Sequence, residues 1–135
     1  MTNELLHKNN TGISSEFLVA GELARRGFNV TMTFGNTKAL DLLVEKEGKL
    51  ISVQVKGIQR IKSICWSISL SKIGNLKAIY VLVNLNADTL ESPEYFILTE
   101  KEVKEHFKET KSGRDYLDYK VAKKLNLQDK WEKLT

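Results

Sequence analysis

The chain has 135 residues, of which 41% are hydrophobic and 28% charged, a balance typical of a soluble globular protein. This length can bury a substantial core, and the single proline and the lack of a Ser/Gly-rich linker indicate no internal boundary. We therefore expect one domain over residues 1–135.

Several classes of protein are excluded by simple patterns. The N-terminal residues contain no apolar segment suited to a signal peptide, and no apolar run approaches the length of a transmembrane helix. Cys65 has no second cysteine for an internal disulfide, and His7 and His106 are too isolated to form a zinc site. We expect a cytoplasmic protein with no membrane partner.

The formal net charge of +4 permits a polyanionic partner, and the distribution of charge is more informative than its sum. Residues 56–87 contain no acid and five basic residues: Lys56, Arg60, Lys62, Lys72 and Lys77. Such a segment suits contacts with a phosphate backbone, and a solvated basic face explains it equally well.

The first predicted element is a helix over residues 14–26, with Thr11, Ser14 or Ser15 as its cap and Gly27 after its end. Helical spacing predicts one apolar stripe made of Ile13, Phe17, Ala20, Gly21 and Ala24. Glu16 lies at the edge of that stripe and is expected to face inward, whereas Glu22 is expected to face water.

Residues 29–34 alternate as a strand does, and two further β-rich runs flank the turn sequence Lys-Glu-Gly-Lys. If Glu47-Gly48 is a two-residue turn, Lys46 pairs with Lys49 and Asp41 falls opposite Gln54. A four-residue loop gives the same register.

The remaining pattern predicts an α/β fold with a mixed central sheet flanked by helices. The continuously apolar run 78–83 indicates a central strand covered on both faces. The other predicted elements are strands at 64–70, 95–98 and 116–119, a helix from the capping box Thr99–Glu102 to about residue 108, and helical residues within 121–134.

The predicted hairpin brings an acid, an amide and a lysine together. Alternation puts Gln54 and Lys56 on one face of their strand, and the register adds Asp41 to that face. Asp41 interrupts an apolar run, and Lys56 ends the alternating sequence Ile-Ser-Val-Gln-Val-Lys. A metal-and-phosphate site is one interpretation, and an ordinary ion pair on a solvated hairpin is the other.

These residues resemble the PD-(D/E)xK nuclease superfamily, which has the restriction-endonuclease-like fold, and in particular its small Holliday-junction-resolvase-like or Mrr-like members. The resemblance covers roughly half of the chain. Its motifs are Gly12-Ile13-Ser14-Ser15-Glu16 on the first helix, Gly27-Phe28-Asn29-Val30 after it, Asp41 at the start of the hairpin, and Gln54-Val55-Lys56 as the (D/E)xK element.

The resemblance implies a Mg²⁺-dependent (or Mn²⁺-dependent) deoxyribonuclease whose catalytic residues are Asp41, Gln54, Lys56 and Glu16. Asp41 would be the principal metal ligand, joined by the Gln54 side-chain oxygen, the Val55 carbonyl and Glu16, directly or through water. Lys56 would orient the attacking water and offset charge on the phosphate.

Two positions depart from the family pattern: Leu40 replaces its proline, and Gln54 replaces its acid. An amide oxygen can ligate a hard cation, as in some Mrr-like relatives, but it brings no negative charge. The alternatives to a nuclease are a weakly active or inactive nucleic-acid-binding module on the same fold, and a protein-interaction module.

The sequence also suggests roles for several other basic and aromatic residues. Arg25, Arg26 and Lys38 could form a phosphate-binding rim, although the two arginines also suit the end of a helix. Trp66 is expected in the core, and Trp131 is expected to fix the C-terminal segment to the body. A homodimer is possible, with the strand at 64–70 as an edge.

Overall fold

The computed structural model describes residues 8–32, 42–60, 65–68, 77–111 and 115–135. Asp41, His7, Lys38, Lys62 and Lys72 therefore lie outside the described residues. The elements are α1 (Lys8–Arg25), β1 (Asn29–Met32), β2 (Leu42–Lys46), β3 (Lys49–Ile58), β4 (Cys65–Ile68), β5 (Lys77–Asn84), β6 (Glu94–Thr99), α2 (Glu100–His106), β7 (Asp115–Asp118), α3 (Tyr119–Lys124) and a 3₁₀ helix (Trp131–Leu134).

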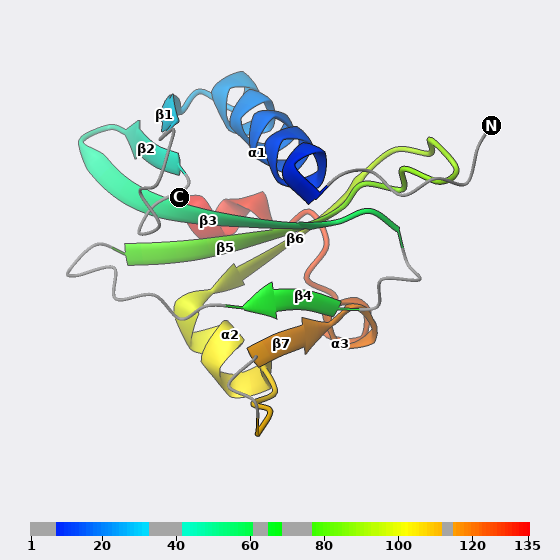
Figure 1. Cartoon of the computed structure of the whole chain (residues 1–135). Helices are drawn as coiled ribbons and strands as arrows, with labels where there is room; N and C mark the ends of the chain where they lie inside the picture. The colour runs from blue at the N-terminus through cyan, green and yellow to red at the C-terminus, as the bar shows by residue number, and fades with distance from the viewer. Residues whose placement is uncertain (1–7, 33–41, 61–64, 69–76, 112–114) are drawn as a thin grey trace.

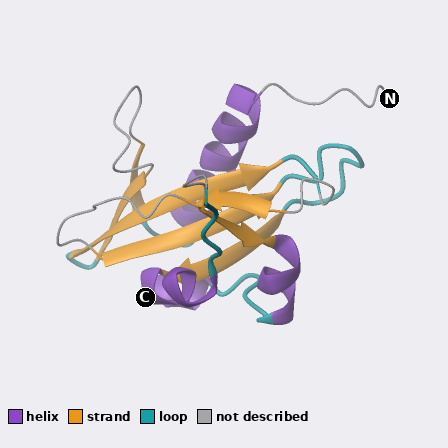
Figure 2. Cartoon of the chain, turned by 60° about the horizontal axis from the view of Figure 1, so that its bottom comes forward, coloured by secondary structure: helices purple, strands orange, loops and turns teal. Residues whose placement is uncertain are grey.

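The described strands form a five-stranded mixed sheet in the order β1-β2-β3-β5-β6 and a separate antiparallel pair of β4 and β7. Helix α1 crosses one face of the large sheet, and the β4–β7 pair with α2 lies on the other face (Figure 1). Figure 2 shows the sheet from a second direction, with α1 rising from one side. The predicted α/β class with a mixed, helix-flanked sheet is confirmed.

The central hairpin follows the predicted register. Lys46 pairs with Lys49, and the two residues between them, Glu47 and Gly48, both have positive φ angles of 52° and 83°. Positive φ at both central positions is the geometry of a type I′ turn, whose twist matches that of the flanking strands. Glycine adopts this conformation without strain, which explains its place in the turn.

Strand β5 is the central strand that its apolar run predicts. It lies between β3 and β6, parallel to the former and antiparallel to the latter, and residues 78–84 are all buried. Its alternate side chains enter two different cores, because Ile79 and Val81 pack with α1 whereas Tyr80 and Leu82 pack on the opposite face.

Helix α1 differs from the prediction in its first residue and in its buried face. It begins at Lys8, ahead of the expected cap residues, and its buried face consists of Thr11, Ser15, Val19, Ala20 and Leu23. The predicted stripe was wrong apart from Ala20.

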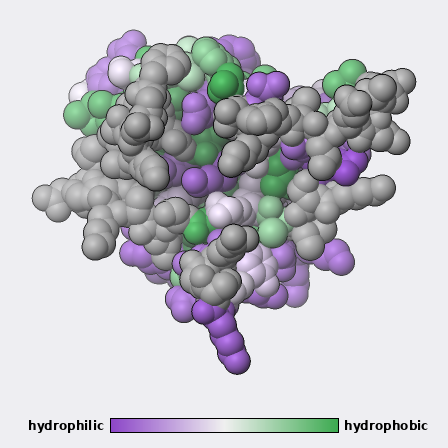
Figure 3. Space-filling view, viewed as in Figure 1, coloured by the Kyte–Doolittle hydropathy of each residue, from purple (hydrophilic) through white to green (hydrophobic). Residues whose placement is uncertain are grey.

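The apolar side chains of that predicted stripe instead face outward. Ile13 is 52% and Phe17 is 55% exposed, Gly21 and Ala24 are exposed too, and green atoms mark this part of the surface over α1 in Figure 3. None of the described helices is long and apolar enough to cross a membrane.

The buried face of α1 is polar at its first turns because of a glycine on β3. A Cβ atom added at Gly57 would lie 2.0 Å from the Ser15 hydroxyl oxygen and 3.3 Å from the Thr11 carbonyl oxygen. Ser15 donates its hydroxyl hydrogen to that carbonyl at 2.7 Å, so a small polar residue is satisfied within the helix. Helix and strand can therefore approach closely here.

The capping box of α2 and the two tryptophans are as the sequence predicts. Thr99 and Glu102 form the predicted capping box of α2, which ends at His106. Trp66 is buried and donates its indole N–H to the Val83 carbonyl at 2.9 Å, as expected for a core residue. Trp131 is also buried, packs on Tyr95 with ring centroids 5.5 Å apart, and joins the C-terminal 3₁₀ helix to the core.

Candidate active site

The candidate site lies on β3, whose two faces differ: one is apolar and the other is polar. Ile51, Val53 and Val55 belong to the core beneath α1. The alternate residues Ser52, Gln54 and Lys56 therefore share the opposite face, as the alternation of a strand requires. The predicted sharing of a face by Gln54 and Lys56 is confirmed.

The hairpin register leads up to Asp41 but stops one residue short of it. The last described pair between β2 and β3 is Leu42 with Val53. The pairing of β3 with β5 continues beyond this point to Ile58. The candidate residues thus lie where β3 runs past the described part of its antiparallel partner, and the placement of Asp41 itself is untested.

Lys56 lies half-buried on this face, opposite Leu82 of β5. Within the described ranges, no hydrogen bond or ion pair is recorded for its ammonium group. Its charge is therefore not committed to a described carboxylate, unlike that of Lys133, which contacts Glu102 at 2.9 Å. A lysine without a structural ion-pair partner is suited to bind an anion.

Gln54 is only 4% exposed, and its amide nitrogen donates to the Ser52 hydroxyl oxygen at 3.5 Å. Its register partner on β5 is Tyr80, which is fully buried. Burial, and secondarily the charge of Glu100, raises the pKa of Tyr80, so this phenol stays neutral. In the described structure the Tyr80 hydroxyl has no hydrogen-bond partner.

Glu16 reaches the same end of β3 from the other side of the sheet. It is half-buried and follows Ser15, the residue that contacts Gly57 immediately after Lys56. However, α1 covers the face of Val53 and Val55, not the face of Gln54. The described structure thus places Glu16 near this end of the strand without bringing it onto the Gln54 face.

Arg25 and Arg26 do not line this end of the sheet. Arg25 is the last residue of α1 and Arg26 follows it, and both pair with Glu22. The Arg26 guanidinium also lies 5.2 Å from the centre of the Trp131 ring. The two arginines therefore stabilise the end of the helix, which is the second of the two interpretations that the sequence allowed.

The oxygen atoms on the Gln54 face could bind a hard cation only if a carboxylate joined them. Among the described residues, no group of three or more His, Cys, Asp or Glu side chains could hold a metal ion. The amide oxygen of Gln54 and the backbone carbonyl of Val55 are oxygen donors of the type that Mg²⁺ accepts. A cation here would require a carboxylate in addition, and Asp41 is the acid nearest in the hairpin register.

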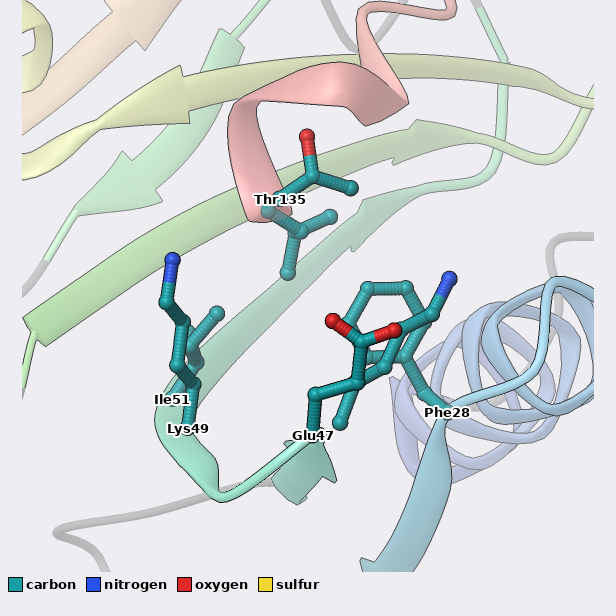
Figure 4. A pocket seen from close by; sticks show the side chains of 7 residues that line it. Phe28, Glu47, Lys49, Ile51 and Thr135 are labelled. Atoms are coloured by element: carbon teal, nitrogen blue, oxygen red, sulfur yellow. The ribbon is translucent and has the colours of Figure 1, made fainter.

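The described surface also has a hollow at the opposite end of β3. It measures about 170 Å³ and is lined by Phe28, Lys46, Glu47, Lys49, Ile51, Leu134 and Thr135 (Figure 4). Lys49 and Lys56 are seven residues apart on one strand, a separation of about 20 Å. The hollow is therefore separate from the candidate site.

Sequence reasoning missed a polar cluster at the end of β5. Glu94 accepts hydrogen bonds from Asn84 and Tyr119 and pairs with Lys123 at 2.7 Å. Burial raises the pKa of Glu94, but the bonds from Lys123, Tyr119 and Asn84 outweigh burial and hold it below its usual value. Since its partners are mutually satisfied, we interpret the cluster as structural. No sequence motif signals it.

Comparisons with known proteins identify the family and the fold of the chain. The family model described as PD-(D/E)XK endonuclease matches residues 6–73, just over half of the chain, so the chain belongs to this family. Among solved structures, the chain is similar to the bacterial homing endonuclease I-Ssp6803I, with a TM-score of 0.62 and 12% identity over 96% of this chain and 92% of that one. That likeness shows the fold. No curated protein matches the chain.

Proposed function

We propose that the protein is a metal-dependent endonuclease that hydrolyses DNA phosphodiester bonds at the polar face of β3. The supporting observation is the described hairpin register, which puts Gln54 and Lys56 on one face and ends one residue before Asp41. Membership of the PD-(D/E)XK endonuclease family supports the same assignment.

The proposed metal ligands come from both strands of the hairpin. If the pairing of β2 with β3 extends by one residue, Asp41 lies opposite Gln54. We propose Asp41 as the principal ligand for Mg²⁺ or Mn²⁺, with the Gln54 amide oxygen, the Val55 carbonyl oxygen and Glu16 as further donors, the last directly or through water. The cation would activate a water molecule and stabilise charge on the phosphate.

Lys56 has the role of an electrostatic group in this proposal. Lys56 is half-buried, lies on the same face as Gln54 and forms no ion pair with a described acid. A positive charge held in this way orients an attacking water molecule and offsets the negative charge that develops on the phosphate. Arg60, beyond the end of β3, adds a second basic side chain at the same end of the sheet.

A specific observation favours a second candidate, a nucleic-acid-binding module with little or no turnover. Gln54 is almost fully buried where the family motif has an acid, so the site has one negative charge fewer with which to hold a dication. Such a module would bind DNA with strong salt dependence and would not respond to metal.

The deciding experiment is incubation of the pure protein with supercoiled, linear and branched DNA in Mg²⁺ or Mn²⁺, beside Asp41→Ala. We expect cleavage by the wild type that EDTA and Asp41→Ala both abolish. Asp129→Ala, which changes an exposed acid in a C-terminal turn, is the matched control and should cleave normally. Cleavage that survives both EDTA and Asp41→Ala would exclude the proposal.

Two related expectations stay predictions. A cytoplasmic location is one. A homodimer through the strand that contains β4 is the other, and β4 pairs on one side with β7 in the described structure. Sedimentation velocity of the full chain measures the oligomeric state directly.

A further inference from the structure

We propose that α1 forms the interface of a weak homodimer, in which two copies of the chain pack the outward faces of this helix against each other in antiparallel orientation. The surface lies outside the candidate active site, and its role does not depend on a metal ion or on DNA cleavage. It is also a different surface from the strand of β4 that the sequence suggests for a dimer.

The outward face of α1 is apolar where a surface helix usually directs charged side chains to water. Ile13 is 52%, Phe17 is 55% and Leu18 is 38% exposed. Among the described elements, none lies over the outward side of α1 (Figure 1). Contiguous apolar residues exposed in this way typically mark an interaction site. The exposed residues between positions 10 and 24 are all uncharged: Asn10, Ile13, Phe17, Leu18, Gly21 and Ala24.

Gly21 on the same face is a second observation. It lies in the interior of the helix, where glycine is less favourable than alanine. No neighbouring heavy atom lies within 4 Å of a Cβ atom added there, so packing within the described chain does not call for a glycine. A missing side chain at such a position allows the close approach of a group from outside.

The charge of the face decides between possible occupants. DNA and an anionic membrane surface are both held by basic side chains, and the exposed residues between positions 10 and 24 include none. The acids Glu16 and Glu22 are half-buried on either side of the face, and Arg25 and Arg26 beyond it pair with Glu22. A second copy of the same uncharged face meets no unpaired charge, and it is therefore the occupant that fits.

The order of large and small residues along the face fits a two-fold axis. The bulky residues Ile13 and Phe17 occupy its first half, and the small residues Gly21 and Ala24 occupy its second half. Antiparallel helices centred near position 19 place Phe17 of each copy over Gly21 of the other, so one patch is complementary to itself. A parallel pair would instead set Phe17 against Phe17 and leave Gly21 opposite a gap.

The size of the face sets the expected affinity. At about 1.5 Å per residue the 18 residues of α1 span about 27 Å, and with a width of about 10 Å the face covers roughly 270 Å² in each copy. Stable interfaces bury about 800 Å² per partner. We therefore expect a weak dimer with a dissociation constant of about 10–100 µM.

Sedimentation equilibrium of the full chain, without DNA or metal, tests the interface at concentrations of about 5–500 µM, which span the expected dissociation constant. We expect the mass of the wild type to rise from one copy to two, and Phe17→Lys to weaken the dimer at least about tenfold because it buries a charge. Leu50→Lys is the matched control: Leu50 is 51% exposed on β3, away from α1, and this variant should dimerise as the wild type does.

A mixing experiment tests the antiparallel register. Gly21→Glu alone should weaken self-association as Phe17→Lys does, because it fills the space that Phe17 of the other copy would occupy. An equal mixture of the two variants should recover the dimer, since the new lysine of one copy then faces the new glutamate of the other. In a parallel dimer these two positions would not meet.

Three results would overturn the proposal. The first is a wild type that stays monomeric throughout the concentration range. The second is a dimer that survives Phe17→Lys, which would place the interface elsewhere, and the third is a mixture of the two variants that fails to associate. Thermal unfolding followed by circular dichroism checks that each variant is folded. None of these measurements involves cleavage, so the nuclease proposal can fail or stand independently.

Discussion

Strand β3 has ten residues, and alternate residues form two faces that differ in character. On one face Val53 and Val55 are buried beneath α1 and join the larger core. On the other face Ser52, Gln54 and Lys56 form a polar row that leads to the end of the strand. The strand is thus anchored by one face while the other presents polar side chains, and substitutions on the two faces should have separable effects.

The largest effect on stability is expected from the anchored face. Val53→Ala removes two methyl groups from a fully buried position and should lower the free energy of unfolding by about 2–3 kcal/mol. The midpoint of urea unfolding measures it. Lys56→Ala, three residues along on the other face, should change stability by less than about 0.5 kcal/mol. Equal losses from the two changes would contradict the division of faces.

The contact between α1 and the end of β3 should be the next most sensitive. Gly57→Ala introduces a Cβ atom 2.0 Å from the Ser15 hydroxyl oxygen, and relieving this clash should cost about 1–3 kcal/mol. Gly21→Ala is the matched control: it lies in α1 with no atom near an added Cβ, and it should stabilise the protein by about 0.5–1 kcal/mol. If calorimetry gives the two changes the same sign, the close approach of helix and strand is not as described.

Replacing the amide on the polar face of β3 should make the stability of the protein depend on metal. Gln54→Glu adds a carboxylate at a position that is almost fully buried, which should destabilise the protein in EDTA because a buried charge is poorly solvated. Mn²⁺ at 100 times its dissociation constant would contribute about 2.7 kcal/mol of stability to the folded state. A melting temperature that does not respond to Mn²⁺ in this variant would count against a cation at this face.

The smallest effect is expected where the polar groups are fully paired. The folded-state pKa of Glu94 is depressed, so its bonds add stability that is present above the unfolded pKa and lost as pH falls through the folded pKa. Glu94→Gln should therefore cost about 1 kcal/mol at pH 7 and progressively less toward pH 3, with cleavage unchanged. A loss of cleavage without a loss of stability would assign the cluster a functional role.

Local signals were sufficient to predict the hairpin. Glu47-Gly48 is a turn sequence, the flanking residues alternate, and together they fix the register that the structure has. The shared face of Gln54 and Lys56 follows from that alternation. These features depend on residues within about fifteen positions of one another, and for this reason the sequence displays them.

The features that sequence reasoning missed depend on distant partners. The buried face of α1 includes Thr11 and Ser15 because Gly57, more than forty residues later, leaves space for them. Helical periodicity favours apolar residues and therefore selected Ile13 and Phe17, which are exposed. The side of the sheet from which Glu16 approaches depends likewise on where the helix docks, which no local pattern specifies.

We propose that cleavage takes place at the Lys56 end of the polar face of β3, and a comparison of two lysines on this strand tests the proposal most directly. The rate of DNA cleavage in Mg²⁺ should be measured for wild type, Lys56→Ala and Lys49→Ala, the last at the hairpin end of β3. We expect Lys56→Ala to slow cleavage by about 100-fold or more, whereas Lys49→Ala should cleave normally. Equal rates for the two variants would contradict it.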